Sequence, residues 1–283
     1  MSIIETIILA IVEGLTEFLP VSSTGHMIIT RDLLGMEAND SFINAFIVII
    51  QFGAILSVVT LYWKRFFRLD HTPAPAGSTP VRAFLHKWDF YWKLLVAFIP
   101  AAVIGLPANH LIEKMLGSVV VVAVMLVIGG VFMLFCDRLF NHGSESTPLT
   151  EKRALRVGLF QCIAMIPGVS RSMATIVGGM AQGLTRKRAA EFSFFLAVPT
   201  MFAATCLDVF KLIKNGGVEA LSAHVPTLLL GSGVAFVVAL LAMKWFVAFL
   251  TKYGFKAFGV YRIIVGGAIL IWLMMGHQLA MVD

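Results

Sequence analysis

The sequence predicts an all-α polytopic membrane protein with six membrane-spanning helices and two shorter, broken helical segments. Of its 283 residues, 59% are hydrophobic and 13% are charged, and the mean hydropathy is +0.89. A soluble domain carries about 25% charged residues, so this composition excludes a soluble class. The apolar stretches run unbroken rather than alternating with polar residues, which excludes a transmembrane β-barrel.

Six stretches are long and apolar enough to span a bilayer, which requires about 20 residues of helix. Five of them contain no charged residue, and the sixth contains only Glu191. The predicted spans are 42–63, 94–112, 118–136, 189–207, 225–243 and 263–282. The N-terminal segment lacks a basic start and is interrupted by glutamates, so we do not expect a cleavable signal peptide.

Two further apolar segments are each broken by a polar cluster. Segment 3–34 is interrupted at 20–25, and segment 155–184 is interrupted at 167–172. A broken helix at membrane depth is tolerated only where its backbone lines protein or a water-filled cavity. We therefore predict two re-entrant helical hairpins, each entering and leaving on the same side of the membrane.

The basic residues are distributed unequally along this predicted topology. The net charge of +6 would suggest nucleic-acid binding in a soluble protein. Here sixteen Lys and Arg residues fall on one side of the membrane and four on the other. The sixteen lie in the segments 64–93, 138–156, 186–188 and 244–256. By the positive-inside rule these loops are cytoplasmic and both termini lie outside, and we expect no nucleic-acid partner.

The two halves of the sequence resemble each other, which predicts an internal duplication. Glu13 and Ser22 are nine positions apart, as are Gln161 and Ser170. A proline precedes the hydroxyl cluster in each case, and a Gly-Gly pair recurs near the end of each half. The alternative is chance recurrence, because small residues are common where membrane helices pack.

The duplication divides a single membrane domain, 1–283, into two repeats, 1–138 and 150–283. Each repeat contains one hairpin and three spans, so the two repeats must have opposite orientations. This inverted-repeat plan places ligands near the bilayer midplane, where two broken helices meet.

Glu13 and Glu17 lie one helical turn apart, on the same face of the first broken segment. An ionised carboxylate at membrane depth costs roughly 2.5–3.5 kcal/mol on insertion scales, so a cation or a proton must offset this pair. Arg171, in the second break, is one candidate cation. A divalent metal on both glutamates, Mg²⁺ or Ca²⁺, is the other. The plainer interpretation is a helix end in the headgroup region, with both carboxylates in water.

We expect no other cofactor. Cys136, Cys162 and Cys206 lie in apolar runs without CxxC spacing, so neither a disulfide framework nor a zinc site is predicted. The sequence contains no Walker loop, and no GxGxxG motif opens a strand, so we expect no nucleotide. Haem is not expected either.

Each break ends at a helix start that is rich in hydroxyl groups. Ser and Thr are good N-caps, and the free N–H groups and positive dipole end of a helix start attract anions. Arg171 adds a planar guanidinium that matches phosphate oxygens. The sequence therefore predicts one phosphate or diphosphate site between the two breaks. The residues expected to bind it are Ser22, Thr24, Gly168, Ser170, Arg171, Ser172 and Thr175.

Ser23 and His26 lie on the opening turn of the helix that follows the first break. A neutral imidazole there could take a proton from the Ser23 hydroxyl, or give one to a leaving oxygen. Direct attack by His26, giving a phosphohistidine, is the alternative chemistry. A histidine that only hydrogen-bonds a neighbouring helix is the plainer structural interpretation.

At these residues the sequence resembles a known family. The segments EGLTEFLPVSSTGH at 13–26 and PGVSRSMAT at 167–175 are similar to the two signature motifs of the undecaprenyl-pyrophosphate phosphatase (bacitracin-resistance) family. Gln51, the EFSFFLAVP stretch at 191–199 and the overall length resemble that family too. The likeness covers essentially the whole chain.

The resemblance implies an enzyme of the bacterial cytoplasmic membrane that hydrolyses undecaprenyl diphosphate to undecaprenyl phosphate. This reaction recycles the lipid carrier for peptidoglycan synthesis and is linked to bacitracin resistance. The resemblance also implies Ser23 as nucleophile, supported by Glu17, His26 and Arg171. Its expected partners are the polyprenyl diphosphate substrate and membrane lipid. The oligomeric state is left open, a homodimer included.

Two other functions fit parts of the sequence. Inverted repeats with broken helices are a transporter plan, so a polyprenyl-phosphate transporter or flippase is the main alternative. A flippase requires an anion site but not a set of Ser, His and Glu, which favours the enzyme. The other group of lipid phosphatases, the phosphatidic-acid phosphatase type, is set aside because Ser170-Arg171 has no His or Asp behind it before Asp208.

Overall fold

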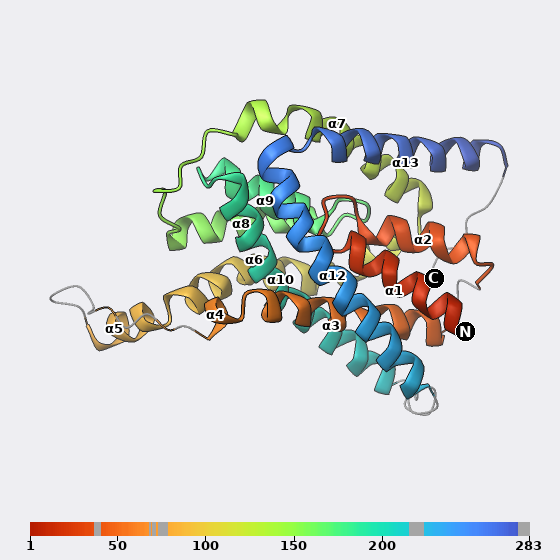
Figure 1. Ribbon diagram of the computed structural model, residues 1–283, viewed down its shortest axis with the longest axis horizontal. Coiled ribbons are helices and arrows are strands. Elements are labelled where there is room, and N and C mark those ends of the chain that lie inside the picture. The colour runs from red at the N-terminus through yellow and green to blue at the C-terminus, as the bar shows by residue number, and fades with distance from the viewer. Residues whose placement is uncertain (37–40, 68, 70–71, 73–78, 215–223, 277–283) are drawn as a thin grey trace.

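The computed structural model describes residues 1–36, 41–67, 69, 72, 79–214 and 224–276. All the regular structure in this part of the chain is helical, which confirms the predicted all-α class (Figure 1). Six described helices are long and apolar enough to cross a membrane, as expected. They are α3 (Ser41–Leu61), α6 (Asp89–Leu116), α7 (Val119–Phe140), α10 (Arg186–Lys214), α12 (Val225–Tyr253) and α13 (Lys256–Met274).

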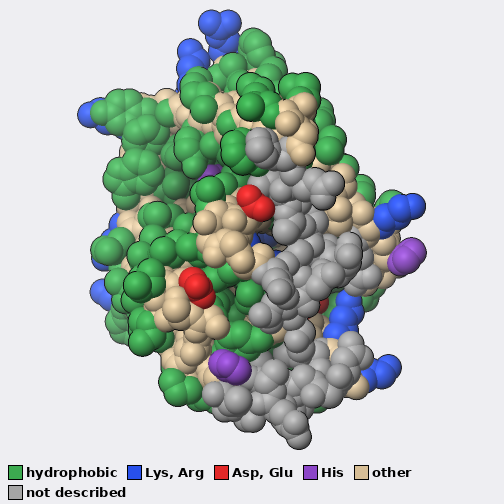
Figure 2. Space-filling model, turned by 90° about the vertical axis from the view of Figure 1, so that its right-hand side faces the viewer, with side chains coloured by type: hydrophobic (Ala, Val, Ile, Leu, Met, Phe, Trp, Pro, Cys, Tyr) green, Lys and Arg blue, Asp and Glu red, His purple; other side chains and the backbone are tan. Residues whose placement is uncertain are grey.

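The surface of the molecule suits a lipid environment. Large apolar side chains are exposed along the long helices, and the span in α6 has only 11% of its residues buried. Figure 2 shows hydrophobic side chains over large areas of the described surface, with Lys and Arg side chains projecting at its margins. The chain is therefore a multi-pass membrane protein.

The last long helix begins earlier than predicted. The predicted span 263–282 starts after the last basic residue, whereas α13 already begins at Lys256. Gly254, with φ +73° and ψ −157°, ends α12 in a backbone conformation that essentially only glycine adopts, and α13 starts two residues later. As a result, Arg262 lies inside the helix. The predicted end of this span falls outside the described residues.

The two broken segments are helix–break–helix units, as predicted, but each break begins three residues earlier than predicted, at 17–22 rather than 20–25 and at 164–170 rather than 167–172. The first consists of α1 (Ile3–Thr16) and α2 (Ser23–Leu33), and the second of α8 (Glu151–Ile163) and α9 (Arg171–Ala181). The longest of these helices, at 14 residues, extends only about 21 Å. A bilayer core is about 30 Å thick, so none of the four could span it alone. Two more short helices, α4 (Trp63–Phe66) and α5 (Pro80–Lys87), precede α6.

The long helices pack in a reciprocal pattern. Helix α1 packs mainly against α12, while α8, its counterpart in the second half, packs against α6. Helices α7 and α13, the last of each half, lie side by side (Figure 1). Gly130 and Gly266, from the two Gly-Gly pairs, both lie in this α7–α13 contact. A two-fold relation between the halves would give this pattern, although their opposite orientation stays a prediction.

Hydrogen bonds bring the basic segments together at one end of the molecule. Trp92 Nε1 donates to Glu151 Oε1 at 2.7 Å. Arg188 donates to the backbone oxygen of Thr147 at 2.6 Å, and Arg186 to that of Thr251 at 3.4 Å. The segments assigned to one side by their charge are therefore neighbours in space. The stretch 72–80 is rich in Pro and Gly, which predicts a solvated linker, and it falls largely outside the described residues.

Candidate functional site

The first break, residues 17–22, ends in an unusual helix start. Ser22 has φ +72°, a left-handed conformation that costs a non-glycine residue roughly 1–3 kcal/mol. Its side chain makes no capping hydrogen bond to α2. The expected serine cap is therefore missing here, and no described side chain caps the N–H groups in the first turn of α2. Such N–H groups are suited to an anion.

The second break, residues 164–170, has the expected cap and a required glycine. Ser170 Oγ accepts a hydrogen bond from the Met173 backbone N–H at 3.3 Å. Gly168 has φ +88°, and a Cβ there would lie 2.4 Å from the Val122 carbonyl oxygen. Only glycine allows both this backbone conformation and this close approach to α7.

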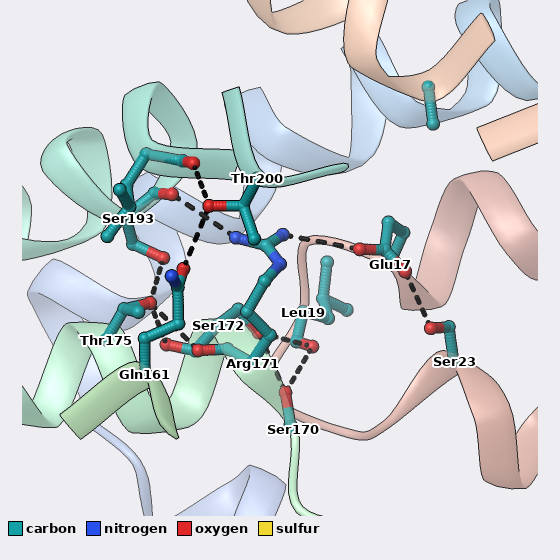
Figure 3. Close-up of polar contacts among 12 residues, drawn as sticks. Glu17, Leu19, Ser23, Gln161, Ser170, Arg171, Ser172, Thr175, Ser193 and Thr200 are labelled. Atoms are coloured by element: carbon teal, nitrogen blue, oxygen red, sulfur yellow. Dashed lines mark hydrogen bonds and ion pairs between the residues drawn. The ribbon is translucent and has the colours of Figure 1, made fainter. Parts of the chain in front are cut away.

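The two breaks meet, as the predicted site requires. Ser172 Oγ donates to the carbonyl oxygen of Leu19 at 2.8 Å, and Ser170 Oγ donates to the same oxygen at 3.4 Å. The two hydroxyls also lie 2.9 Å apart (Figure 3). These two serines, predicted to bind phosphate, thus join the second break to the first in this structure.

An ion pair and a hydrogen bond extend the junction to Ser23. Arg171 reaches from the start of α9 to Glu17, with 3.3 Å between Nη2 and Oε1 (Figure 3). The other oxygen of Glu17, Oε2, accepts a hydrogen bond from Ser23 Oγ at 2.6 Å. The Arg171 and Glu17 side chains are only 15% and 9% exposed. Arg171 is therefore paired with Glu17 but not with Glu13, and Glu17 is the hydrogen-bond acceptor for Ser23.

His26 contacts Ser22 and Tyr261 rather than Ser23. Its Nδ1 lies 2.8 Å from the Ser22 carbonyl oxygen, and its Nε2 lies 2.6 Å from the Tyr261 hydroxyl. A carbonyl only accepts hydrogen bonds, so Nδ1 carries the proton and Nε2 accepts from Tyr261. The geometry therefore favours Glu17 over His26 as the base for Ser23.

Glu13 is fully buried, and no N–H or O–H group of the described residues donates to its carboxylate oxygens. The Glu17 carboxyl, one turn later, lies within hydrogen-bond reach of it. A buried pair of carboxyls fits a site for a cation, or for a proton shared between them. No group of three or more His, Cys, Asp and Glu able to hold a metal occurs in the described part of the chain. Substrate oxygens would therefore have to complete the coordination of a metal held here.

The remaining predicted residues lie around this junction. Thr175 Oγ1 donates to the Arg171 backbone oxygen at 2.8 Å and lies 2.6 Å from the Ser193 hydroxyl of α10. Thr24 is exposed on the first turn of α2. Gln161, the counterpart of Glu13, is buried and accepts from Thr200 at 3.3 Å.

Sequence reasoning missed Ser193, Tyr261 and Arg262. Arg262 is fully buried and hydrogen-bonds the backbone of both breaks. An arginine inside an apolar helix is a functional signal in its own right. Arg262 was not recognised as such a signal because the predicted span began one residue after it. Tyr261 gave no such signal, because tyrosine is common in membrane helices near the interface.

An apolar cavity of about 270 Å³ lies between α7 and the second hairpin. It is lined by side chains that include Ile128, Phe132, Phe160, Ile163, Val169 and Met173. Val169 and Met173 flank the Ser170–Ser172 segment, so the cavity adjoins the second break. Ile163 is 50% exposed, which places it at the mouth of the cavity.

Comparison with known proteins identifies the family. The family model described as bacitracin resistance protein BacA matches residues 6–268. A relative from Porphyromonas gingivalis is 56% identical over 281 residues, covering 99% of this chain and 100% of the relative. One from Bdellovibrio bacteriovorus is 51% identical over 286 residues, covering all of both chains. Both relatives bear the name undecaprenyl-diphosphatase. The chain belongs to the bacitracin resistance protein BacA family.

Proposed function

We propose that this protein is an undecaprenyl-diphosphatase, which hydrolyses undecaprenyl diphosphate to undecaprenyl phosphate and inorganic phosphate. The observation that carries the proposal is the Arg171–Glu17–Ser23 chain across the two breaks. It combines a nucleophile, a base within hydrogen-bond reach and a cation for phosphate oxygens. The reaction returns the lipid carrier to peptidoglycan synthesis, and a higher capacity for it confers bacitracin resistance.

In the first step, Ser23 Oγ attacks the terminal phosphorus and its proton passes to Glu17. The bond from phosphorus to the bridging oxygen breaks, and undecaprenyl phosphate leaves with the electron pair and takes the proton from Glu17. Arg171 and the N–H groups at the start of α2 stabilise the charge that develops on the phosphoryl oxygens.

In the second step, Glu17 takes a proton from water, and the water oxygen attacks the phosphoserine. The Ser23 Oγ–phosphorus bond breaks, and Oγ recovers its proton from Glu17. A phosphohistidine on His26 remains the alternative intermediate, because Nε2 would be its nucleophilic atom once Tyr261 moved away. Isolating the phosphoenzyme and finding the phosphate on His26 would assign that route.

The metal expectation rests on Glu13. A divalent cation, Mg²⁺ or Ca²⁺, would be held by Glu13 together with Glu17 and phosphate oxygens. Bound there, it would withdraw negative charge from the phosphoryl group. Glu13→Gln is expected to weaken Mn²⁺ binding, measured by electron paramagnetic resonance, while leaving the helix content unchanged.

The clustering of the basic segments supports the proposed location. We place the protein in the cytoplasmic membrane with these segments in the cytoplasm and both termini outside, following the positive-inside rule. Labelling of single cysteines introduced at Ser2 and at Ser146, in a variant whose three native cysteines are replaced by alanine, with a reagent that does not cross the membrane, tests this orientation. Labelling at Ser146 alone in intact cells would reverse it.

The cavity between α7 and the second hairpin supports a lipid substrate. Its lining is apolar, and it adjoins the segment that carries Arg171. We propose that the prenyl chain next to the diphosphate lies in this cavity. Isoprene units are apolar, and within the bilayer they would bind an apolar cavity through van der Waals packing.

Ile163→Trp is expected to fill the mouth of the cavity and to raise KM for undecaprenyl diphosphate several-fold, with kcat changed less. Leu159→Trp is a matched control, because Leu159 is also on α8, is 51% exposed and does not line the cavity. Initial rates over a range of substrate concentrations in detergent separate the two effects. Equal KM values for the two variants would exclude the cavity as the prenyl site.

Phosphate release by the purified protein in detergent tests the function itself, because detergent leaves no second compartment for transport. We expect release from undecaprenyl diphosphate that stops when EDTA is added and returns with Mg²⁺ or Ca²⁺. Binding of the lipid without phosphate release would instead support a transporter. Release that persists unchanged in EDTA would contradict the metal expectation but not the hydrolase.

A further inference from the structure

Arg262 of α13 touches both breaks at once. Its Nη1 donates to the Pro20 carbonyl oxygen at 3.2 Å, in the first break, and its Nη2 donates to that of Gly168 at 2.8 Å, in the second. Nε and Nη2 also donate to the carbonyls of Leu126 and Met125 on α7, at 3.3 and 3.1 Å. One side chain thus joins two segments that are 148 positions apart in the sequence.

The carbonyl oxygens of Pro20 and Gly168 require a side-chain hydrogen-bond donor. Pro20 and Gly168 lie outside the helices, so no helical N–H is in place for their oxygens. A buried carbonyl without a partner is costly, most of all at membrane depth. The guanidinium satisfies both with one planar group, which also fixes their relative position.

Helix α7 is shaped to accept this guanidinium. A Cβ at Gly129 would lie 2.5 Å from Arg262 Nη2. Glycine at this position therefore leaves the space that the arginine fills. The contact is a built feature of the α7–α13 packing rather than a side chain folded back onto its own helix.

Tyr261, the residue before Arg262, contacts His26. The Tyr261 hydroxyl lies 2.6 Å from His26 Nε2, and the two rings are within 9° of parallel with centroids 5.5 Å apart. Together with the Ser22 carbonyl on Nδ1, this contact fixes both the tautomer and the orientation of the imidazole. Two consecutive residues of α13 therefore contact the breaks and the first turn of α2.

We propose that Tyr261 and Arg262 are positioning residues of the active site: Arg262 holds the two breaks in register, and Tyr261 orients His26. The proposal rests on the proposed hydrolase function, since the register places the nucleophile against the phosphate site. Arg262 acts through the backbone, because its guanidinium is fully buried and each of its three nitrogens already donates to a carbonyl.

Arg262→Lys tests the first part. A lysine ammonium cannot reach all four carbonyls, so the breaks should shift relative to each other. A misplacement of about 1 Å can cost about 100-fold in rate, so we expect kcat to fall about 100-fold while KM changes less than about threefold. The control is Arg186→Lys, another largely buried arginine, which joins α10 to α7 through Asp137 and whose hydrogen bonds in the described part of the chain reach neither break. Its kcat should stay near that of the wild type.

Hydrogen exchange gives a readout that does not depend on activity. In Arg262→Lys, the backbone amides of 17–22 and 164–170 should exchange faster than in the wild type, and in Arg186→Lys they should not. This readout also separates the two proposals. If wild-type protein released no phosphate, the proposed function would fail, while hydrogen exchange would still test the register.

Tyr261→Phe tests the second part, because it keeps the ring and removes only the hydroxyl. We expect kcat to fall about tenfold with KM nearly unchanged, because the hydrogen bond through His26 ties the first turn of α2, which carries Ser23, to α13. The His26 ¹⁵N resonances should change as Nε2 loses this partner. Tyr253→Phe, at an exposed tyrosine near the end of α12, is the control and should match the wild type.

Three results would overturn the proposal. If the backbone amides of both breaks exchanged as slowly in Arg262→Lys as in the wild type, Arg262 would not hold the breaks in register. A rise in KM with kcat preserved would show that Arg262 contacts the substrate directly. If Tyr261→Phe left both kcat and the His26 resonances unchanged, Tyr261 would not be a positioning residue.

Discussion

Replacing Ser23 by alanine is expected to lower kcat by at least about 10³-fold. The Ser23 hydroxyl is the nucleophile of the proposed reaction, and its hydrogen bond to Glu17 at 2.6 Å places its proton on the path to a base. Loss of the nucleophile of a covalent mechanism removes the whole set of interactions that act through it. Phosphate release from undecaprenyl diphosphate in detergent, at saturating substrate, measures the effect.

Thr30→Ala is the matched control for Ser23→Ala. Thr30 is also on α2, and its hydroxyl donates only to the backbone oxygen of His26, at 2.7 Å. This variant should keep more than about half of the wild-type kcat, since a hydroxyl bonded only to its own helix contributes little. Rapid quenching with labelled substrate should also trap phosphate on Ser23. Label on His26, or full activity in Ser23→Ala, would contradict the assignment.

The hairpins could be predicted because their signals are local. Pro20 and Pro167 interrupt apolar helices, and the hydroxyl-rich residues that follow start new ones, so composition alone marks both breaks. The meeting of the two breaks followed from the internal duplication. The contact between Ser172 and Leu19 confirms that meeting, although the sequence did not indicate which atoms would touch.

The hydrogen-bond partners could not be predicted, because they depend on tertiary packing. His26 follows Ser23 by three residues, so helix geometry predicts that the two side chains lie close together. The direction of the imidazole is set instead by Tyr261, from the far end of the chain. Glu17 occupies the position of base that spacing alone assigned to His26. Nothing near residue 26 in the sequence indicates a partner 235 positions away.

The charge balance of the site also changed with the structure. From the sequence, two glutamates and a bound diphosphate face a single arginine, and a divalent metal is one candidate to balance them. Arg262 is a second buried cation close to both breaks, so the resting site holds Glu13 and Glu17 beside Arg171 and Arg262. The expectation of a metal therefore depends on the burial of Glu13, to which no described N–H or O–H group donates, more than on net charge.

The second large effect is expected for Arg171→Ala, with kcat/KM lowered about 10³-fold. Arg171 is the cation on Glu17, at 3.3 Å, and starts the helix whose N-terminus faces the phosphate site. Removing an arginine that stabilises a phosphoryl transition state costs about 10³-fold or more. Arg171→Lys keeps the charge without the planar fork and should recover only part of the activity.

Loss of activity must be separated from loss of the fold, because Arg171→Ala leaves Glu17 as a largely buried, unpaired carboxylate. We expect its unfolding free energy to fall by up to about 3 kcal/mol. Arg186→Ala is the control, since Arg186 and Asp137 form a pair at 2.7 Å with similarly small exposure, 17% and 13%, away from the breaks. It should lose comparable stability and keep its kcat.

The double variant Arg171→Ala, Glu17→Gln separates the two roles of the pair. The neutral amide no longer leaves a buried charge unpaired, so thermal stability should recover most of what Arg171→Ala lost. Activity should not recover, because the double variant lacks both the base for Ser23 and the cation for the phosphate. If Arg171→Ala kept near-normal turnover, or if the double variant regained activity along with stability, Arg171 would be a structural residue only. A catalytic site shared between the two hairpins would then be wrong.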